Sequence, residues 1–250
     1  MNEKKMLSFV VVSNDEKKLN GMLRSSLEMQ SFTDYELIVV DGSKYRSASS
    51  AYNTGAKQAI GKYILFLHHD IIFTSVHAVE KMMNYVSLLD SNQYALLGFA
   101  GVLGFGKETK RIMSMQNGAD RKVFSYKELQ EPEECFSVDE CGFMMERKKF
   151  LQYGFEDLGN TWHLYAVELC LHIKANGERV GVMPVDVWHC SLGKLNSDYY
   201  SKIRVLAKKY EKVFPRIFTT CITVDMTNPR WKLLLIKRQV HLWLDEHIRN

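Results

Sequence analysis

Two histidines and an aspartate follow directly after a short apolar segment in the first third of the chain. Residues 62–67 form the apolar run, Gly61 precedes it, and His68, His69 and Asp70 come next. Such a run is typical of an interior strand of an α/β sheet, and ligands of open α/β sheets bind beyond the carboxyl ends of the strands. The sequence therefore predicts a substrate site here. A carboxylate suits Mg²⁺ or Mn²⁺, and imidazole shifts the preference toward Mn²⁺ or a later metal.

The elements that position these side chains alternate between strand and helix. Strands are predicted at 7–12, 35–40 and 62–67, and helices at 16–30 and 47–60. This β-α-β-α-β order predicts parallel strands with right-handed crossovers. It brings Ser13, Asn14 and Asp41 to the same edge of the sheet as His68 and Asp70.

The rest of the chain predicts further strands and helices around a less regular segment. The stretch 103–118 contains three glycines and mixed charges, which indicates a mobile loop or an irregular hairpin. Strands are predicted at 94–102, 136–145 and 179–188, and helices at 76–89, 147–153, 162–175, 198–214 and 230–248.

Composition narrows the class of protein. The chain has 250 residues, 46% of them hydrophobic, and a net charge of +4, which supports a sizeable core and predicts no nucleic-acid partner. The apolar run at 6–12 is too short for a signal peptide or a membrane span. Five cysteines without paired spacing indicate reduced thiols. We therefore expect a cytoplasmic protein.

Several motifs, in order and spacing, resemble family 2 glycosyltransferases of the GT-A fold between residues 7 and 193. They are SFVVVSND, ELIVVDGS, SAYNTGAKQAIGKYILFLHHD, VDECGFMMERKKFLQYGFED, WHLYAVELCLHIKANG and VWHCSLGK. The resemblance implies a mixed, mostly parallel sheet flanked by helices in residues 1–195. A helical extension over 196–250 would then pack on this domain or at an interface.

The resemblance also implies a nucleotide-diphosphate-sugar donor, most simply UDP-linked. Ser13, Asn14 and Asp41 would face the base and ribose, while Asn53 and Gly55 would lie on a helix lining the nucleotide pocket. Two alternatives stay open. Asp41 can simply begin a turn, and Gly55 can allow a helix to pack closely on a strand.

Asp70 matches the last residue of the family's Asp-x-Asp motif, which binds metal and diphosphate. A metal there neutralises the charge of the leaving nucleoside diphosphate. His68 replaces the first aspartate, so it could bind the metal, contact the ribose or pack. The resemblance gives His189 as a residue that completes the metal or diphosphate site. The implied cofactor is Mn²⁺ or Mg²⁺.

Inverting transfer needs a carboxylate that takes the proton of the acceptor hydroxyl. The family's acidic pair aligns with Tyr165 and Ala166, so it is missing here. Glu168 is the best remaining candidate for the base, with Asp157 and Glu156 of the preceding loop as rivals. Asp139, on the preceding strand, is a further catalytic candidate, because the family often has an acid there near the donor sugar or the acceptor. Trp162 and His163, at the start of the same predicted helix, would contact the acceptor.

The acceptor is expected to be a glycan or a lipid-linked glycan. The last helices combine basic and apolar residues, which leaves packing on the domain, a homodimer, or peripheral contact with the inner face of an anionic membrane open. Alternative functions are a non-catalytic nucleotide-sugar-binding protein and a nucleotidyltransferase, although residues 13–19 lack a glycine-rich, basic loop. A third alternative function is a metal hydrolase whose site is built from His68, His69, Asp70, His163 and His189.

Overall fold

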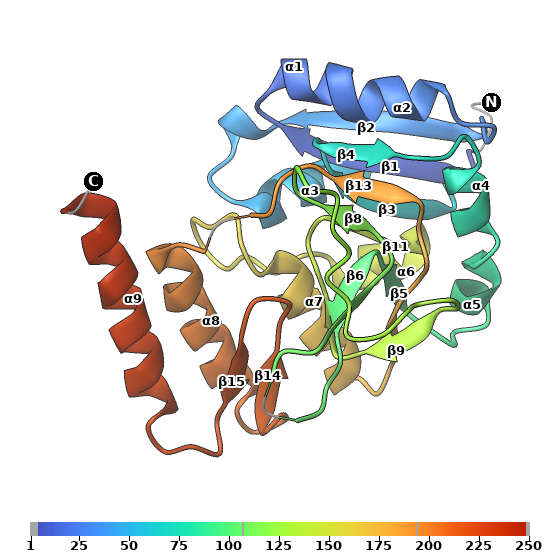
Figure 1. The fold of residues 1–250 in the computed structure, drawn as a ribbon. Coiled ribbons are helices and arrows are strands. Elements are labelled where there is room, and N and C mark those ends of the chain that lie inside the picture. The colour runs from blue at the N-terminus through green and yellow to red at the C-terminus, as the bar shows by residue number, and fades with distance from the viewer. Residues whose placement is uncertain (1–4, 107, 194, 249–250) are drawn as a thin grey trace.

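The computed structural model describes residues 5–106, 108–193 and 195–248 (Figure 1). The ends of the two predicted domain ranges, 1–4 and 249–250, and residue 194 of the last motif therefore lie outside the described residues.

A central sheet carries the fold. In the described part of the chain, its seven strands follow the order β2-β1-β3-β11-β5-β12-β9. Only β11 and β9 run against the other strands of this described sheet, which confirms the predicted mixed, mostly parallel class. The strands are β1 (Leu7–Ser13), β2 (Tyr35–Asp41), β3 (Tyr63–His68), β5 (Leu96–Gly98), β9 (Glu133–Cys135), β11 (Gly142–Glu146) and β12 (Val180–Val182).

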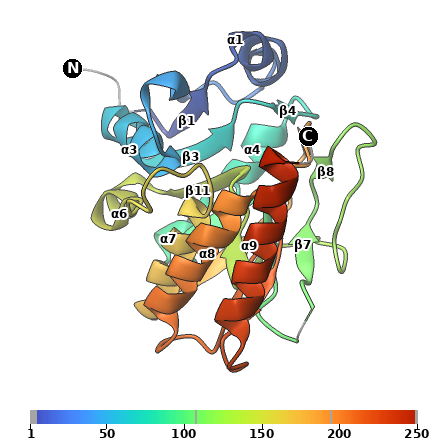
Figure 2. The same ribbon diagram turned by 90° about the vertical axis from the view of Figure 1, so that its left-hand side faces the viewer.

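Helices cover both faces of this sheet (Figures 1 and 2). The helix predicted at 16–30 is a continuous run of α1 (Glu16–Lys18), a π-helical turn (Leu19–Arg24) and α2 (Ser25–Glu28). It buries Leu23 and Leu27 against one face. The other face is covered by α3 (Ala48–Gln58), α6 (Arg147–Tyr153) and α7 (Tyr165–Ala175). The helix predicted at 76–89 is two short helices, α4 (Ala78–Met83) and α5 (Val86–Asp90).

Each of the three later predicted strands is divided between two sheets, so the prediction of single strands was wrong. Residues 94–102 give β5 and β6 (Ala100–Val102), 136–145 give β10 (Ser137–Val138) and β11, and 179–188 give β12 and β13 (Val187–His189). Side chains pack closely at two of these divisions. A Cβ at Gly142 would lie 2.4 Å from the Phe99 ring, and one at Gly98 would lie 2.6 Å from Val138.

The other strand of each pair, β6, β10 or β13, belongs to one of two small sheets beside the central one. One has the order β10-β6-β7 and the other β4-β13-β8. They include β4 (Ile71–Phe73), β7 (Arg111–Met113) and β8 (Gln116–Asn117). The segment predicted as a loop or irregular hairpin thus supplies β7 and β8.

The C-terminal part adds α8 (Ser197–Tyr210), a hairpin of β14 (Arg216–Phe218) and β15 (Thr223–Asp225), and α9 (Trp231–His247). A hydrophobic cluster joins α8 and α9 to Leu164, Val167 and Leu171 at and within α7. Figure 2 shows α7, α8 and α9 side by side. The hairpin was not predicted, and the division at residue 195 stays a prediction. None of the described helices is long and apolar enough to cross a membrane.

Candidate functional site

Two adjoining cavities, among those that the described residues form, lie beyond the carboxyl ends of β1, β2 and β3. One measures about 410 Å³, and Asn14, Lys18 and Gly42 contribute to its wall. The other measures about 430 Å³, and Asp139 and Glu140 contribute to its wall. His68, Trp162 and Ser191 line both. We call the first the strand-end cavity and the second the carboxylate cavity.

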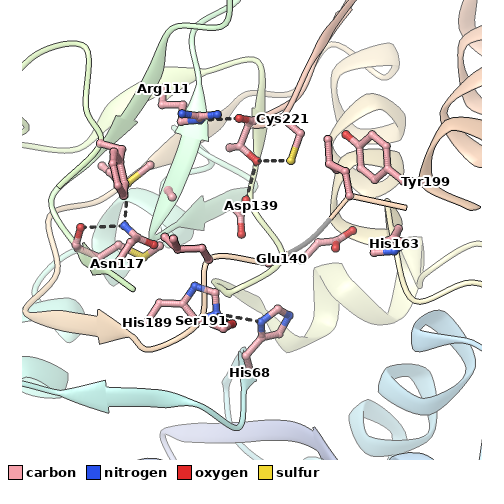
Figure 3. A pocket seen from close by; sticks show the side chains of 18 of the residues that line it. His68, Arg111, Asn117, Asp139, Glu140, His163, His189, Ser191, Tyr199 and Cys221 are labelled. Carbon is pink, nitrogen blue, oxygen red and sulfur yellow. Dashed lines mark hydrogen bonds between the residues drawn. The ribbon is translucent and has the colours of Figure 1, made fainter. Parts of the chain in front are cut away.

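His68, Asp70 and His189 meet where the cavities adjoin. His68 ends β3, Asp70 lies between β3 and β4, and His189 ends β13. The antiparallel pairing of β13 with β4 sets His189 opposite Ile71, beside Asp70. Figure 3 shows the two histidine rings turned toward one another.

The three side chains lie close enough to share one ion. His189 Nε2 is 3.4 Å from His68 Nδ1 and 3.4 Å from Asp70 Oδ1. One ligand atom from each of the three residues lies within 4.8 Å of the other two. Two ligand atoms about 2.1 Å from a metal at a tetrahedral angle are about 3.4 Å apart. The donor set therefore fits a divalent cation, and its two imidazoles suit Mn²⁺ or a later metal better than Mg²⁺.

The protonation states agree with this fit. Burial, aided by the charge of His189, lowers the pKa of His68 to about 4. Burial raises the pKa of Asp70, but hydrogen bonding to His189 and the charge of that histidine lower it more, so the net shift is downward. Neutral imidazole and ionised carboxylate are the forms that bind metals.

The carboxylate cavity holds Asp139 and Glu140, two consecutive acids between β10 and β11. Asp139 accepts hydrogen bonds from Thr220 Oγ1 at 2.6 Å and from the backbone N–H of Cys141 at 3.1 Å. Burial raises the pKa of Asp139, but the Thr220 hydrogen bond and the charge of His189 lower it more. Asp139 is thus held ionised above the His68–His189 pair (Figure 3).

Glu140 has the opposite environment. Its Oε1 is buried and has no hydrogen-bond partner among the described residues. Burial and the neighbouring charge of Asp139 raise the pKa of Glu140 well above its usual value. Adjacent carboxyls whose pKa values are pushed apart are typical of acid–base chemistry. Sequence reasoning missed Glu140, although the Asp-Glu pair between two apolar strands was the available signal.

Lys18 is a second residue that the sequence predictions missed. Its side chain lines the strand-end cavity, where it faces Asp15 at 3.8 Å. Its position in the first helical turn after β1 was the available signal, because the carboxyl end of that strand was already predicted to lie at the site.

Glu168 and Asp157, two of the predicted bases, contribute to neither cavity. Glu168 is 1% exposed and accepts hydrogen bonds from Lys209 Nζ and Tyr210 Oη, both at 2.8 Å. Its carboxylate therefore lies on the side of α7 that packs against α8. Asp157 is exposed and accepts from the backbone N–H of Gly159 at 2.8 Å. This geometry does not support either residue as the base, because neither reaches the cavity where an acceptor would lie.

The predicted nucleotide-binding residues are only partly brought together. Asn14 and His68 line the strand-end cavity. Ser13 instead lies 2.9 Å from His69 Nδ1, and Asp41 accepts from the backbone N–H and hydroxyl of Ser43 at 3.0 and 2.6 Å. Asp41 thus begins a turn, which is the alternative that the sequence left open. Its neighbour Gly42 lines the strand-end cavity.

Asn53 and Gly55 hold α3 in place. The Asn53 amide donates to the Phe155 carbonyl at 2.8 Å and accepts from the Phe155 N–H at 3.0 Å. A Cβ at Gly55 would lie 2.5 Å from Val10 Cγ1. Gly55 therefore allows α3 to pack closely on β1, which is the second alternative that the sequence left open. The nucleotide-binding roles of Asn53 and Gly55 stay predictions.

Both predicted acceptor residues line the carboxylate cavity. Trp162 is 43% exposed and reaches into both cavities, and His163 lies on the same side of the carboxylate cavity as Glu140 (Figure 3). Burial lowers the pKa of His163, so its ring is neutral at neutral pH. Contact with an acceptor stays a prediction for both.

Comparison with known families agrees with this architecture. The sequence model of a family described as glycosyltransferase-like matches residues 8–211. The chain belongs to this family, which confirms the predicted class of enzyme. None of the curated proteins compared matches the chain.

Solved structures of TarS from S. aureus share the fold. TarS 1–349 is 18% identical with a TM-score of 0.56, over 82% of this chain and 65% of that one. The same fragment in complex with UDP is 14% identical with a TM-score of 0.57, over 98% and 73%. Its complex with UDP-GlcNAc is 16% identical with a TM-score of 0.55, over 82% and 66%. The chain thus spans about two thirds of this fragment, and the likeness agrees with the predicted GT-A type of fold.

Proposed function

We propose that the protein is an inverting, metal-assisted glycosyltransferase that moves a sugar from a UDP-linked donor to a glycan or a lipid-linked glycan. One observation carries the proposal: the strand-end and carboxylate cavities adjoin at the His68–Asp70–His189 cluster. A diphosphate at this junction would leave the nucleoside on one side and the donor sugar on the other.

The strand-end cavity suits the nucleoside diphosphate. It combines Asn14, Gly42 and the cationic Lys18 with the cluster. His68, Asp70 and His189 would hold the divalent ion, which when bound neutralises charge on the leaving diphosphate. The UDP and UDP-GlcNAc complexes of the similarly folded TarS support a uridine donor.

Glu140 is the proposed base. It lines the carboxylate cavity with an unpartnered oxygen, and burial beside Asp139 raises its pKa, which makes its ionised carboxylate a stronger base. The acceptor oxygen attacks the anomeric carbon, the bond to the diphosphate breaks, and its electron pair leaves with the diphosphate. The acceptor proton passes to Glu140. Asp139, held by Thr220, would orient the donor sugar.

A non-catalytic nucleotide-sugar-binding protein is the second candidate. Tyr165 and Ala166 stand where the resemblance places the family's acidic pair, and both are buried in the core. Binding of the donor without transfer would follow if Glu140 does not replace that pair.

Two measurements on the same protein separate these functions. The first is the melting temperature with UDP and a panel of UDP-sugars, with Mn²⁺ or with EDTA, because a ligand of the folded state raises it. The second is release of UDP in the presence of a glycan and lipid-linked glycan fraction, with the product identified by mass spectrometry. Stabilisation with transfer supports the enzyme, and stabilisation without transfer from any donor supports the binding protein. No stabilisation by any nucleotide contradicts both.

A further inference from the structure

The outward face of α9 is apolar and uncovered. Its inward side packs on α8 through Trp231, Leu235 and Leu242. Figures 1 and 2 show α9 at the outside of the molecule with no other drawn element over its outer side. The exposed apolar residues of this helix are Leu233, Leu234, Ile236, Val240 and Trp243, with exposed fractions of 63, 52, 40, 50 and 47%.

These residues form one surface rather than scattered contacts with solvent. Leu233, Ile236, Val240 and Trp243 recur at intervals of three and four residues, which places them on one helix face. Ile248, 64% exposed, follows directly after the helix. Contiguous apolar surface of this kind marks a site of interaction with a protein or a membrane.

The charges on this helix favour an anionic occupant. Lys237 lies at the edge of the same face, four residues after Leu233 and three before Val240. No ion pair or hydrogen bond to a described residue engages its side chain. The helix's two acids lie in its last turns, where Glu246 accepts from Ser197 of α8 at 2.9 and 2.7 Å and Asp245 is 3.5 Å from His241.

We propose that α9 docks its outward face on an anionic lipid bilayer, lying in the plane of the interface. Apolar side chains enter the boundary of the acyl chains, and Lys237 meets the lipid phosphates. A second copy on the same face fits less well, because it would bring the unpaired cations of both copies together. The proposal does not depend on the transferase reaction.

Vesicle co-sedimentation of the full chain tests the docking. The probes are vesicles of phosphatidylcholine alone and of phosphatidylcholine with 30% phosphatidylglycerol. We expect sedimentation with the anionic vesicles, little with the neutral ones, and weaker binding as salt increases. Equal sedimentation with both vesicles, or none with either, overturns the proposal.

Two variants separate the charge from the apolar contribution. Lys237→Gln should lower partitioning about fivefold, which is the contribution of one cation near an anionic surface. Leu233→Ser with Val240→Ser should abolish it while the far-UV circular dichroism stays unchanged, because both side chains are half or more exposed.

Matched controls carry the same chemical changes elsewhere. Lys57→Gln removes one exposed cation from α3, and Val76→Ser with Leu151→Ser removes two side chains that are 52 and 50% exposed. These should bind anionic vesicles like the parent. If the α9 variants bind like the parent, or if light scattering shows a dimer that Leu233→Ser with Val240→Ser dissociates and vesicles are not bound, α9 is not a lipid-docking helix.

Discussion

At the scale of single residues, the site has other side chains at the positions where the family resemblance implies acids. His68 stands where the resemblance implies a metal-binding aspartate, and its Nδ1 lies 3.4 Å from Nε2 of His189. Tyr165 and Ala166 stand for the acidic pair. Glu140, from a different element, brings a carboxylate into the same cavity as Trp162 and His163. The predicted base role of Glu168 is not supported by this arrangement, since that carboxylate is buried against Lys209 and Tyr210.

The base is tested by Glu140→Gln, which nearly preserves size but removes the proton acceptor. We expect kcat to fall about 10²- to 10⁴-fold, while the Kd for the donor changes little. Steady-state UDP release and calorimetric titration of UDP measure the two.

Glu168→Gln is the matched control and should retain near-parental kcat in the folded fraction. Asp139→Asn tests the rival base. Parental turnover by Glu140→Gln together with an inactive Asp139→Asn would assign the base to Asp139 instead.

The metal site is tested by Asp70→Ala. We expect the parent to be stabilised more by UDP with Mn²⁺ than with EDTA, and the variant to lose this difference because one of the three ligands is gone. Thermal unfolding with both additions measures it. Asp157→Ala, which removes an exposed acid outside both cavities, should behave like the parent.

His68→Asp is a second test of the proposed metal site. It should keep nucleotide binding and shift the preference toward Mg²⁺, because a hard oxygen replaces imidazole. Equal stabilisation of the parent with and without metal would remove the metal role.

At the scale of elements, the site depends on how closely helices and strands approach. Helix α3 lies on β1 and β2 because Gly55 leaves room for Val10 and Val40, whose methyl groups would be 2.5 and 3.0 Å from a Cβ. On the other side, Asn53 of the same helix ties the Phe155 backbone of the loop before α7. This helix therefore sets the distance between the strand ends and the start of α7.

Gly55→Ala should destabilise the protein by about 1–2 kcal/mol. Overpacking a core costs about 1–3 kcal/mol, and the gain in helix propensity of up to about 1 kcal/mol offsets part of that. Urea unfolding measures the change.

Gly21→Ala is the matched control. That glycine is in the helical run after β1 with nothing within 4 Å of a Cβ, so the change should stabilise by about 0.5–1 kcal/mol. Equal stabilities of Gly55→Ala and the parent would show that α3 can shift without cost.

At the scale of the whole molecule, the C-terminal segment completes the cavity wall. The loop between β14 and β15 brings Thr220 onto Asp139, and Arg111 Nε donates to the Thr220 carbonyl at 2.6 Å. Figure 3 shows Arg111, Cys221 and Asp139 on this wall. Residues 81 and 109 positions apart in the chain thus meet at one site. The site residues that lie before residue 195 do not form the cavity alone.

The reactivity of Cys221 reports on this closure. Cys221 is an exposed residue, but desolvation of its thiol at the cavity wall and the charge of Asp139 raise the pKa of that thiol to about 11. Because the thiolate is the nucleophile, a raised pKa leaves less of it at pH 8, so iodoacetamide should react about 100-fold more slowly than with an ordinary thiol. The rate should rise about tenfold per pH unit up to about pH 11. Mass spectrometry of the labelled peptide in a Cys190→Ser background measures it.

Asp139→Asn in that background should speed labelling of Cys221, because it removes a charge that opposes the thiolate. Two outcomes would show that the hairpin does not hold Cys221 beside the carboxylate. One is labelling of Cys221 in the parent at the rate of free cysteine at pH 8, and the other is a labelling rate that Asp139→Asn does not change.

The sequence by itself determined the alternating first half of the fold and the site edge. Apolar runs of strand length, separated by helical spacing, predicted β1, β2, β3 and α3 within a few residues, and parallel strands necessarily bring Asn14, His68 and Asp70 to one edge. His189 was also named from sequence, because the family resemblance implies a histidine there. The strand and helix predictions rest on local periodicity and on the handedness of crossovers, which need no knowledge of distant contacts.

Only the tertiary structure decided which carboxylates reach the cavities. Strands predicted as single pieces divide between two sheets, and Asp139 and Glu140 lie at one such division, between β10 and β11, in the cavity wall. Phe99 and Val138 pack beside these divisions, where Gly142 and Gly98 have no Cβ. The direction in which Glu168 points depends on α8, and the closing of the wall depends on a hairpin more than 80 residues away. A side chain's environment is set by such non-local packing, so spacing along one element cannot reveal whether its carboxylate meets a substrate or a lysine.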